Sequence, residues 1–112
     1  PGQTSTPHVV FLKNVNSGAA LAITAAATAV SGSLSADDIT VTIEARNPDG
    51  TDLPDAPVTQ SLSAWATPTA LGTPNIPDNG EQRYHVTASV AGTVTTSGAS
   101  TGFNLVFTGT QL

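Results

Sequence analysis

The sequence predicts an all-β protein that folds as one β-sandwich of about seven strands. Several short segments alternate apolar and polar residues, and Asn, Asp, Gly and Pro separate them, as in antiparallel β-proteins. Threonine, whose branched side chain favours strands, supplies 18 of the 112 residues. A chain of this length needs only one hydrophobic core. A small jelly roll or β-barrel is the alternative architecture.

Alternation is clearest in residues 39–46 and 83–90. In both segments every second residue is apolar or aromatic, and the residues between them are polar, so each segment is expected to form a strand with one buried face. The residues expected to face the core are Ile39, Val41, Ile43 and Ala45 in the first segment and Tyr84, Val86, Ala88 and Val90 in the second.

Residues 8–15 form the first predicted strand. Val9, Phe11 and Lys13 share one face of it, and Val10 and Leu12 share the other, which we expect to point outward. Apolar residues on both faces indicate that the strand is buried on both sides or that a partner covers one of them.

The other strands are less sharply marked. Residues 19–30 combine helix-favouring alanines with strand-favouring Ile, Thr and Val, and we predict a strand that ends near Ala26. Further strands are expected over 58–66, which contains Trp65, and over 93–96 and 103–107. Three prolines in residues 67–80 argue against a central strand there. We expect residues 1–7 to form an extended arm and residues 8–112 to form the domain.

Composition excludes several classes of protein. The net charge of −5, with only three Lys and Arg residues, argues against nucleic acid as a partner. No apolar run approaches the ~20 residues that span a bilayer, and no signal sequence is recognisable. Without cysteine, disulfides and thiolate sites are impossible. Pro1 resembles the residue left after removal of an initiator Met, which leads us to expect a free-standing cytosolic product.

We expect no enzyme activity and no cofactor. His8 and His85 lie on different predicted strands and lack a third ligand for zinc, and His85 is expected to face away from the core. No G-x-S-x-G element accompanies the serines. Glu44 and Glu81 could pair as glycosidase carboxylates only beside aromatic residues able to hold a sugar, and their segments offer no such lining.

One loop has the composition of a weak calcium site. Asp49, Asp52 and Asp55 follow Asn47 closely, and calcium prefers several oxygen ligands from a flexible loop. The alternating spacing of an EF-hand is missing. A solvated turn is therefore the default interpretation of this loop.

Two stretches carry a resemblance to a known family. Residues 39–59, ITVTIEARNPDGTDLPDAPVT, resemble bacterial immunoglobulin-like domains of the invasin and intimin type, in which an alternating strand enters an Asp-, Gly- and Pro-rich loop and continues into a Pro-Val-Thr strand. Residues 84–92, YHVTASVAG, resemble the penultimate strand of such sandwiches, with Tyr84 as the tyrosine-corner residue and Val86 where antibody domains carry a cysteine. The resemblance implies an immunoglobulin-like β-sandwich.

Such domains also decorate tailed-phage particles, and by this analogy we expect a virion structural protein, most specifically a capsid decoration or cement protein. It would be made in the host cytoplasm, bind the major capsid protein or another virion protein, and form a homo-oligomer, for which a trimer is one candidate. The alternatives are a module of a bacterial cell-surface adhesin, a tail- or fibre-associated domain and, more weakly, a carbohydrate-binding module.

The expected interaction residues belong to the arm and to outward faces of strands, because a cluster of exposed apolar residues marks an interface. They are Pro1, Gly2, Gln3, Thr4, Ser5, Thr6 and Pro7 of the arm and Val10, Leu12 and Val106 of the strands, with Val94 as a further candidate.

Overall fold

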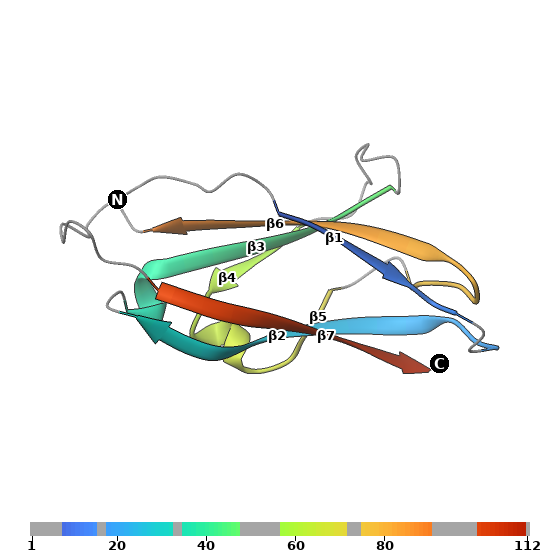
Figure 1. Cartoon of the computed structure of the whole chain (residues 1–112), viewed down its shortest axis with the longest axis horizontal. Helices are drawn as coiled ribbons and strands as arrows, with labels where there is room; N and C mark the ends of the chain where they lie inside the picture. The colour runs from blue at the N-terminus through green and yellow to red at the C-terminus, as the bar shows by residue number, and fades with distance from the viewer. Residues whose placement is uncertain are drawn as a thin grey trace.

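The chain folds into two antiparallel β-sheets that pack face to face (Figure 1). In this computed structural model the described residues are 8–15, 18–32, 35–47, 57–71, 75–90 and 101–111. They contain strands and short 3-10 turns but no α-helix. The two sheets share no strand, so these residues form a sandwich and not a closed barrel. The predicted all-β class is confirmed.

One sheet has four strands in the order β1-β6-β3-β4. Their bounds are His8–Lys13 for β1, Glu81–Val90 for β6, Ile39–Arg46 for β3 and Val58–Ser61 for β4. Burial alternates strictly along β3 and over most of β6, as their sequences predict. These two central strands therefore supply most of this sheet's inner face.

The other sheet has the order β5-β2-β7, with bounds Thr69–Ala70, Leu21–Gly32 and Thr101–Gln111. The ambiguous alanine-rich segment is thus a strand, but it ends at Gly32 and not near Ala26. Pairing with β7 continues along its whole length, interrupted by a β-bulge between Thr28 and Ser31. The partner strand outweighs the helical preference of alanine.

Trp65 lies at the centre of the core, although not on a strand. The expected strand over 58–66 is wrong beyond Ser61, because a 3-10 turn, η2 (Ala64–Ala66), follows β4. This turn places the indole between the sheets, where it is fully buried and its Nε1 donates a hydrogen bond to the carbonyl of Val41 at 3.0 Å. A second 3-10 turn, η1 (Ala36–Asp38), leads into β3.

The proline-rich segment contributes only to an edge of the second sheet. β5 has two residues and pairs only with β2, so prolines close to it break no central ladder. Farther along, Ile76 forms an isolated bridge with Leu21. The predicted turn at Asp78-Asn79-Gly80 is present: Asn79 has φ 60° and the Gly80 N–H bonds the Pro77 carbonyl at 2.7 Å.

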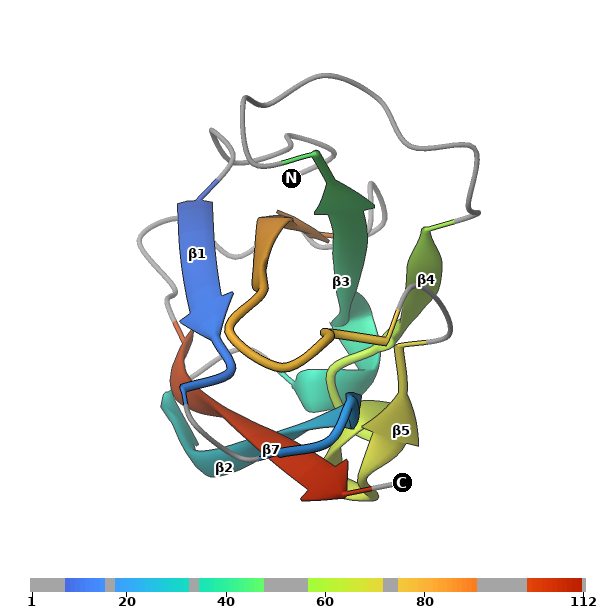
Figure 2. The ribbon, with the colours of Figure 1, turned by 90° about the vertical axis from the view of Figure 1, so that its right-hand side faces the viewer.

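The pairing of the terminal strands, β1 and β7, determines which strands form the edges of the two sheets. β1 pairs with β6 in one sheet, and β7 pairs with β2 in the other. In the common immunoglobulin arrangement the first strand instead lies beside the second, and the last beside the penultimate. Here β1 and β7 are edge strands on the same side of the sandwich, and β4 and β5 bound the opposite side (Figure 2).

Candidate protein-interaction site

An apolar groove of about 630 Å³ opens between the two edge strands β1 and β7. Two residues of β1, two of β6 and four of β7 line it: His8, Val10, Val86, Ala88, Phe103, Asn104, Leu105 and Phe107. Beneath β3 the core is shielded from solvent, since Val41 is fully buried. On β7, by contrast, Phe103, Leu105 and Phe107 are only partly buried. The described residues thus leave the sandwich incompletely covered on its β1–β7 side.

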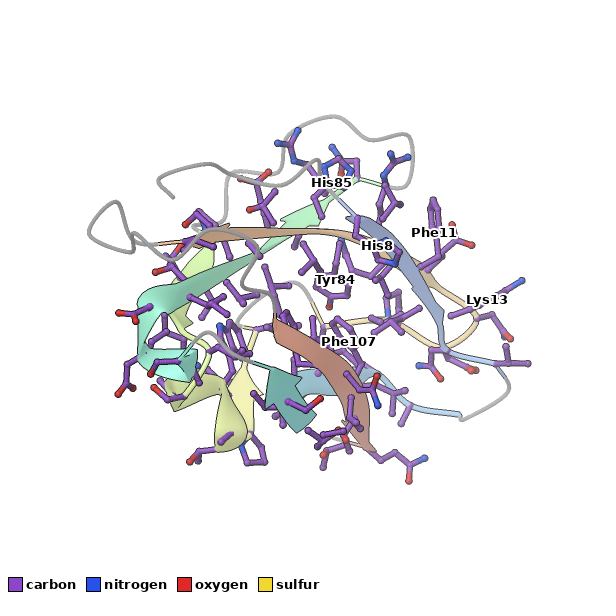
Figure 3. The ribbon with its side chains drawn as sticks, turned by 60° about the vertical axis from the view of Figure 1, so that its left-hand side comes forward. His8, Phe11, Lys13, Tyr84, His85 and Phe107 are labelled. Atoms are coloured by element: carbon purple, nitrogen blue, oxygen red, sulfur yellow. The ribbon has the colours of Figure 1, made fainter. Side chains whose placement is uncertain are left out.

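An aromatic pair holds the sheets together beside this groove. The rings of Tyr84 on β6 and Phe107 on β7 lie between the sheets, with centroids 5.7 Å apart (Figure 3). Tyr84 is buried, and burial raises the pKa of its hydroxyl to about 12. The phenol therefore stays neutral at physiological pH and acts there as a packing group.

The two strands that flank the groove have few features that block further strand pairing. Lys13, at the end of β1, is the only Lys, Arg, Asp or Glu residue of that strand, and β7 contains none. Natural edge strands are usually shortened, charged, bulged or covered, because their free N–H and C=O groups can pair with another chain. On the opposite side, β4 and β5 offer edges of only four and two residues.

The faces of β1 are reversed relative to the sequence expectation. Val10 and Leu12 pack toward the core, whereas Val9 and Phe11 point outward with 38% and 51% of their surface exposed. The cause is the register with β6, which places Val10 opposite the buried Tyr84. Because both faces of the segment are apolar, its periodicity alone could not distinguish them.

Phe11 and His85 lie on the outer side of the four-stranded sheet (Figure 3), and Arg83 contacts both of them. The Arg83 guanidinium lies 5.3 Å from the centre of the Phe11 ring, within cation–π range, and its Nε donates a hydrogen bond to Nε2 of His85 at 2.9 Å. Partial desolvation, followed by the positive charges of Arg83 and Arg46, lowers the pKa of His85, and Glu44 opposes this effect. The cluster pairs a neutral imidazole with an arginine-covered aromatic ring.

All three Lys and Arg residues of the chain lie on strands of the four-stranded sheet. Arg46 stands opposite Arg83 in the ladder and forms an ion pair with Glu44. Lys13 stands opposite Glu81. A carboxylate thus accompanies Arg46 and Lys13, whereas the described contacts of Arg83 are with Phe11 and His85.

A group of hydroxyls surrounds η1 at another part of the molecule. Ser63 Oγ donates to a carboxylate oxygen of Asp37 at 2.5 Å, and it lies 3.1 Å from the Ser61 hydroxyl. Ser35 Oγ accepts from the Asp37 N–H, which caps the turn. The two histidines belong to β1 and β6 and not to this group. These bonds anchor the 3-10 turn beside β4.

The structure separates the sequence-predicted interaction residues. Val106 is exposed on β7, as predicted, at 47%. Val10 lines the groove and Leu12 packs against the core. The arm 1–7, Val94 and the loop carrying Asp49, Asp52 and Asp55 lie outside the described residues. Within the described ranges, no three His, Cys, Asp or Glu residues are grouped as metal ligands.

Sequence reasoning missed Val9, Phe11 and Arg83 as possible contact residues. A signal was available, since a strand apolar on both faces must expose one of them when its sheet covers only one side.

None of the helices among the described residues is long and apolar enough to cross a membrane. Comparison with protein-family models, curated proteins and solved structures gave no match.

Proposed function

We propose that this chain is a structural protein that works by binding other proteins through the β1–β7 side of its sandwich. The observation that carries the proposal is the partly covered apolar groove between two edge strands. Val9 and Phe11 on the outer face of β1 and Val106 on the outer face of β7 are further exposed apolar side chains of the same two strands. Aromatic residues and arginine are enriched at protein interfaces, and the Phe11–Arg83 pair supplies both.

The same geometry supplies a mechanism of binding. A partner that covers this side removes the half-buried groove residues from water, which provides the main driving force. Among the described strands β1 and β7 are sheet edges, which adds direction, because an extended segment can hydrogen-bond to such an edge as an extra strand. Apolar burial and strand pairing thus act on one surface.

The setting that we propose is a virus particle, with this chain as a capsid decoration or cement protein bound to the major capsid protein or another virion protein. Its hydroxyl-rich, weakly charged composition supports this assignment, because such a surface loses little charge solvation when a lattice covers it. Many copies on one particle would compensate for modest affinity at each site. The protein would be made in the host cytoplasm and retained in the virion.

We further propose that the fold is a variant of the immunoglobulin-like sandwich in which the first and last strands exchange sheets. Strand β3 and most of β6 keep the alternation expected of that fold, with Tyr84 and Val86 facing the core. The exchange would leave β1 and β7 as opposed edges, and the groove would be its consequence.

A binding assay on particles tests the proposed function. Particles purified from a source strain that lacks the gene are mixed with the purified protein and sedimented, and bound copies are counted by quantitative mass spectrometry. Binding at many copies per particle is expected. Phe11→Glu and Val106→Glu, which alter exposed edge residues, should each reduce binding about tenfold or more. The control is Val30→Glu, because Val30 is 42% exposed but belongs to β2 and does not line the groove.

Two results would overturn the proposal. Absence of binding by the wild-type protein would remove the virion assignment, and the chain's presence in a cell-surface fraction would favour the adhesin module. Equal losses for Val30→Glu and for the two edge variants would show that the β1–β7 side is not the binding surface.

A further inference from the structure

We infer that a second copy of this chain covers the β1 edge, forming a two-fold dimer in which β1 pairs antiparallel with β1 of the partner copy. The inference rests on the proposed role of the β1–β7 side and names one occupant for it. It would join the two four-stranded sheets into one continuous eight-stranded sheet.

The side chains of β1 are complementary to themselves. An antiparallel register centred on Val10 places Val9 of each copy opposite Phe11 of the other on the outer face, and Val10 opposite Val10 on the inner face. Directly opposite residues lie on the same face of a sheet, and pairs of aromatic and β-branched residues stabilise such ladders. This register would cover the most exposed apolar side chains of the strand, 38% and 51% exposed in the single chain.

Charge also favours a second copy at this edge. Each chain carries −5, so two copies repel unless they meet where negative charge is balanced or absent. Beside β1, Lys13 stands opposite Glu81 and Arg83 stands opposite Phe11, and β7 contributes no charge. The described carboxylates Asp37 and Asp38 are instead on η1, which precedes β3. The β1 edge is therefore a place where two acidic chains can approach.

The two-fold dimer would also cover the groove between β1 and β7. His8 and Val10 of β1 form one wall, and β7 forms the other. Pairing through β1 would bring the groove of one copy against that of the other, so each copy would shield the partly exposed apolar residues of its partner. Strand pairing and closure of the groove would then occur in one step.

Sedimentation velocity over a range of concentrations tests the dimer. A species of twice the 11.2 kDa chain mass is expected, and Val9→Lys should weaken dimerisation about tenfold or more, because it places a cation opposite Phe11 in both halves of the interface. Val30→Lys, an equally exposed valine on β2, should dimerise like the wild type. A wild-type protein that stays monomeric up to about 100 µM, or equal dimerisation of the two variants, would overturn the inference.

A single introduced cysteine tests the register, since the chain contains none of its own. Opposed Cα atoms in an antiparallel ladder lie about 4.5–5.5 Å apart, within the range that a disulfide bridges. Val10→Cys should therefore form a covalent dimer on mild oxidation, whereas Thr59→Cys on the β4 edge should not. Equal cross-linking of both would contradict pairing through β1. A dimer that does not bind particles would retain this inference and overturn only the virion assignment.

Discussion

The aromatic rings of Tyr84 and Phe107 join the two sheets across the open side of the sandwich. Their centroids are 5.7 Å apart and their planes are inclined by 31°, a separation at which aromatic pairs attract each other. Tyr84 is buried on the central strand β6, whereas Phe107 is partly buried on the edge strand β7. This contact holds an edge strand against the opposite sheet beside the groove.

Replacing Phe107 with alanine should remove this connection. We expect Phe107→Ala to lower the free energy of unfolding by about 2–4 kcal/mol, through lost apolar burial and the cavity left beside Tyr84. Urea denaturation followed by circular dichroism measures the change. Val30→Ala, a truncation at an exposed site, should stay within about 0.5 kcal/mol of the wild type. A loss for Phe107→Ala no larger than the loss for Val30→Ala would contradict the role of the pair.

The raised pKa of Tyr84 predicts a loss of stability in alkali. The unfolded chain releases the tyrosine proton near its ordinary pKa of 10, whereas the folded chain retains it up to about 12. Between these values the unfolded state binds fewer protons, so stability should fall as pH rises from 10 to 12. The urea midpoint of the wild type should therefore fall relative to that of Tyr84→Phe over this range, because the variant cannot ionise there. Parallel curves would show that Tyr84 does not titrate differently in the two states.

Strands with one buried face could be predicted from the sequence, because buried apolar residues alternate along them with polar ones. In β3, Ile39, Val41, Ile43 and Ala45 are all buried, as their spacing requires. Trp65 could not be placed in this way, because its position depends on the distance between the sheets and on its hydrogen bond to the carbonyl of Val41. Its local sequence is equally compatible with a strand.

The candidate site was less predictable, because it depends on which strands the terminal segments join. Apolar residues on both faces of β1 indicated that one face is exposed or covered by a partner, but the face was decided by the register of Val10 with Tyr84. The groove further requires that β7 pairs with β2 and not with β6. Such long-range pairings leave no local pattern in the sequence.

Asn14 is a buried polar residue that connects three segments, and its loss should be costly. Its Nδ2 donates to the carbonyls of Ala19 at 2.8 Å and of Ile76 at 3.0 Å, and its backbone N–H bonds Gly80. Asn14→Ala should lower the free energy of unfolding by about 1–3 kcal/mol, because these carbonyls lose a buried donor. The same substitution at exposed Asn104 should change it by less than about 0.5 kcal/mol. Comparable losses at both positions in urea denaturation would contradict this role of Asn14.

The bulge in β2 contains a strained alanine. Ala29 has φ 53°, a left-handed conformation that costs a residue with a Cβ roughly 1–2 kcal/mol and glycine almost nothing. Ala29→Gly should therefore raise the free energy of unfolding by about 0.5–1 kcal/mol, after the greater chain entropy of glycine is deducted. Ala22→Gly, in the regular part of the same strand, should lower it by about the same amount. Denaturation curves in which both variants lose stability would show that Ala29 is not strained.

Arg83 should control the protonation of His85 on the outer face of the sheet. After partial desolvation, the charge of Arg83 is the next cause of the lowered pKa of His85, and its Nε–H occupies the Nε2 atom that protonation requires. Arg83→Gln should therefore raise the pKa of His85, since it removes both the positive charge and the Nε donor. An NMR titration of the imidazole C–H signals measures this pKa, and a His85→Gln variant identifies which of the two histidine signals belongs to this site. Lys13→Gln is the matched control, because it removes one positive charge from β1, and Lys13 is not among the groups that shift the His85 pKa. A His85 pKa that responds equally to both variants would show that net charge, and not contact with Arg83, sets its protonation.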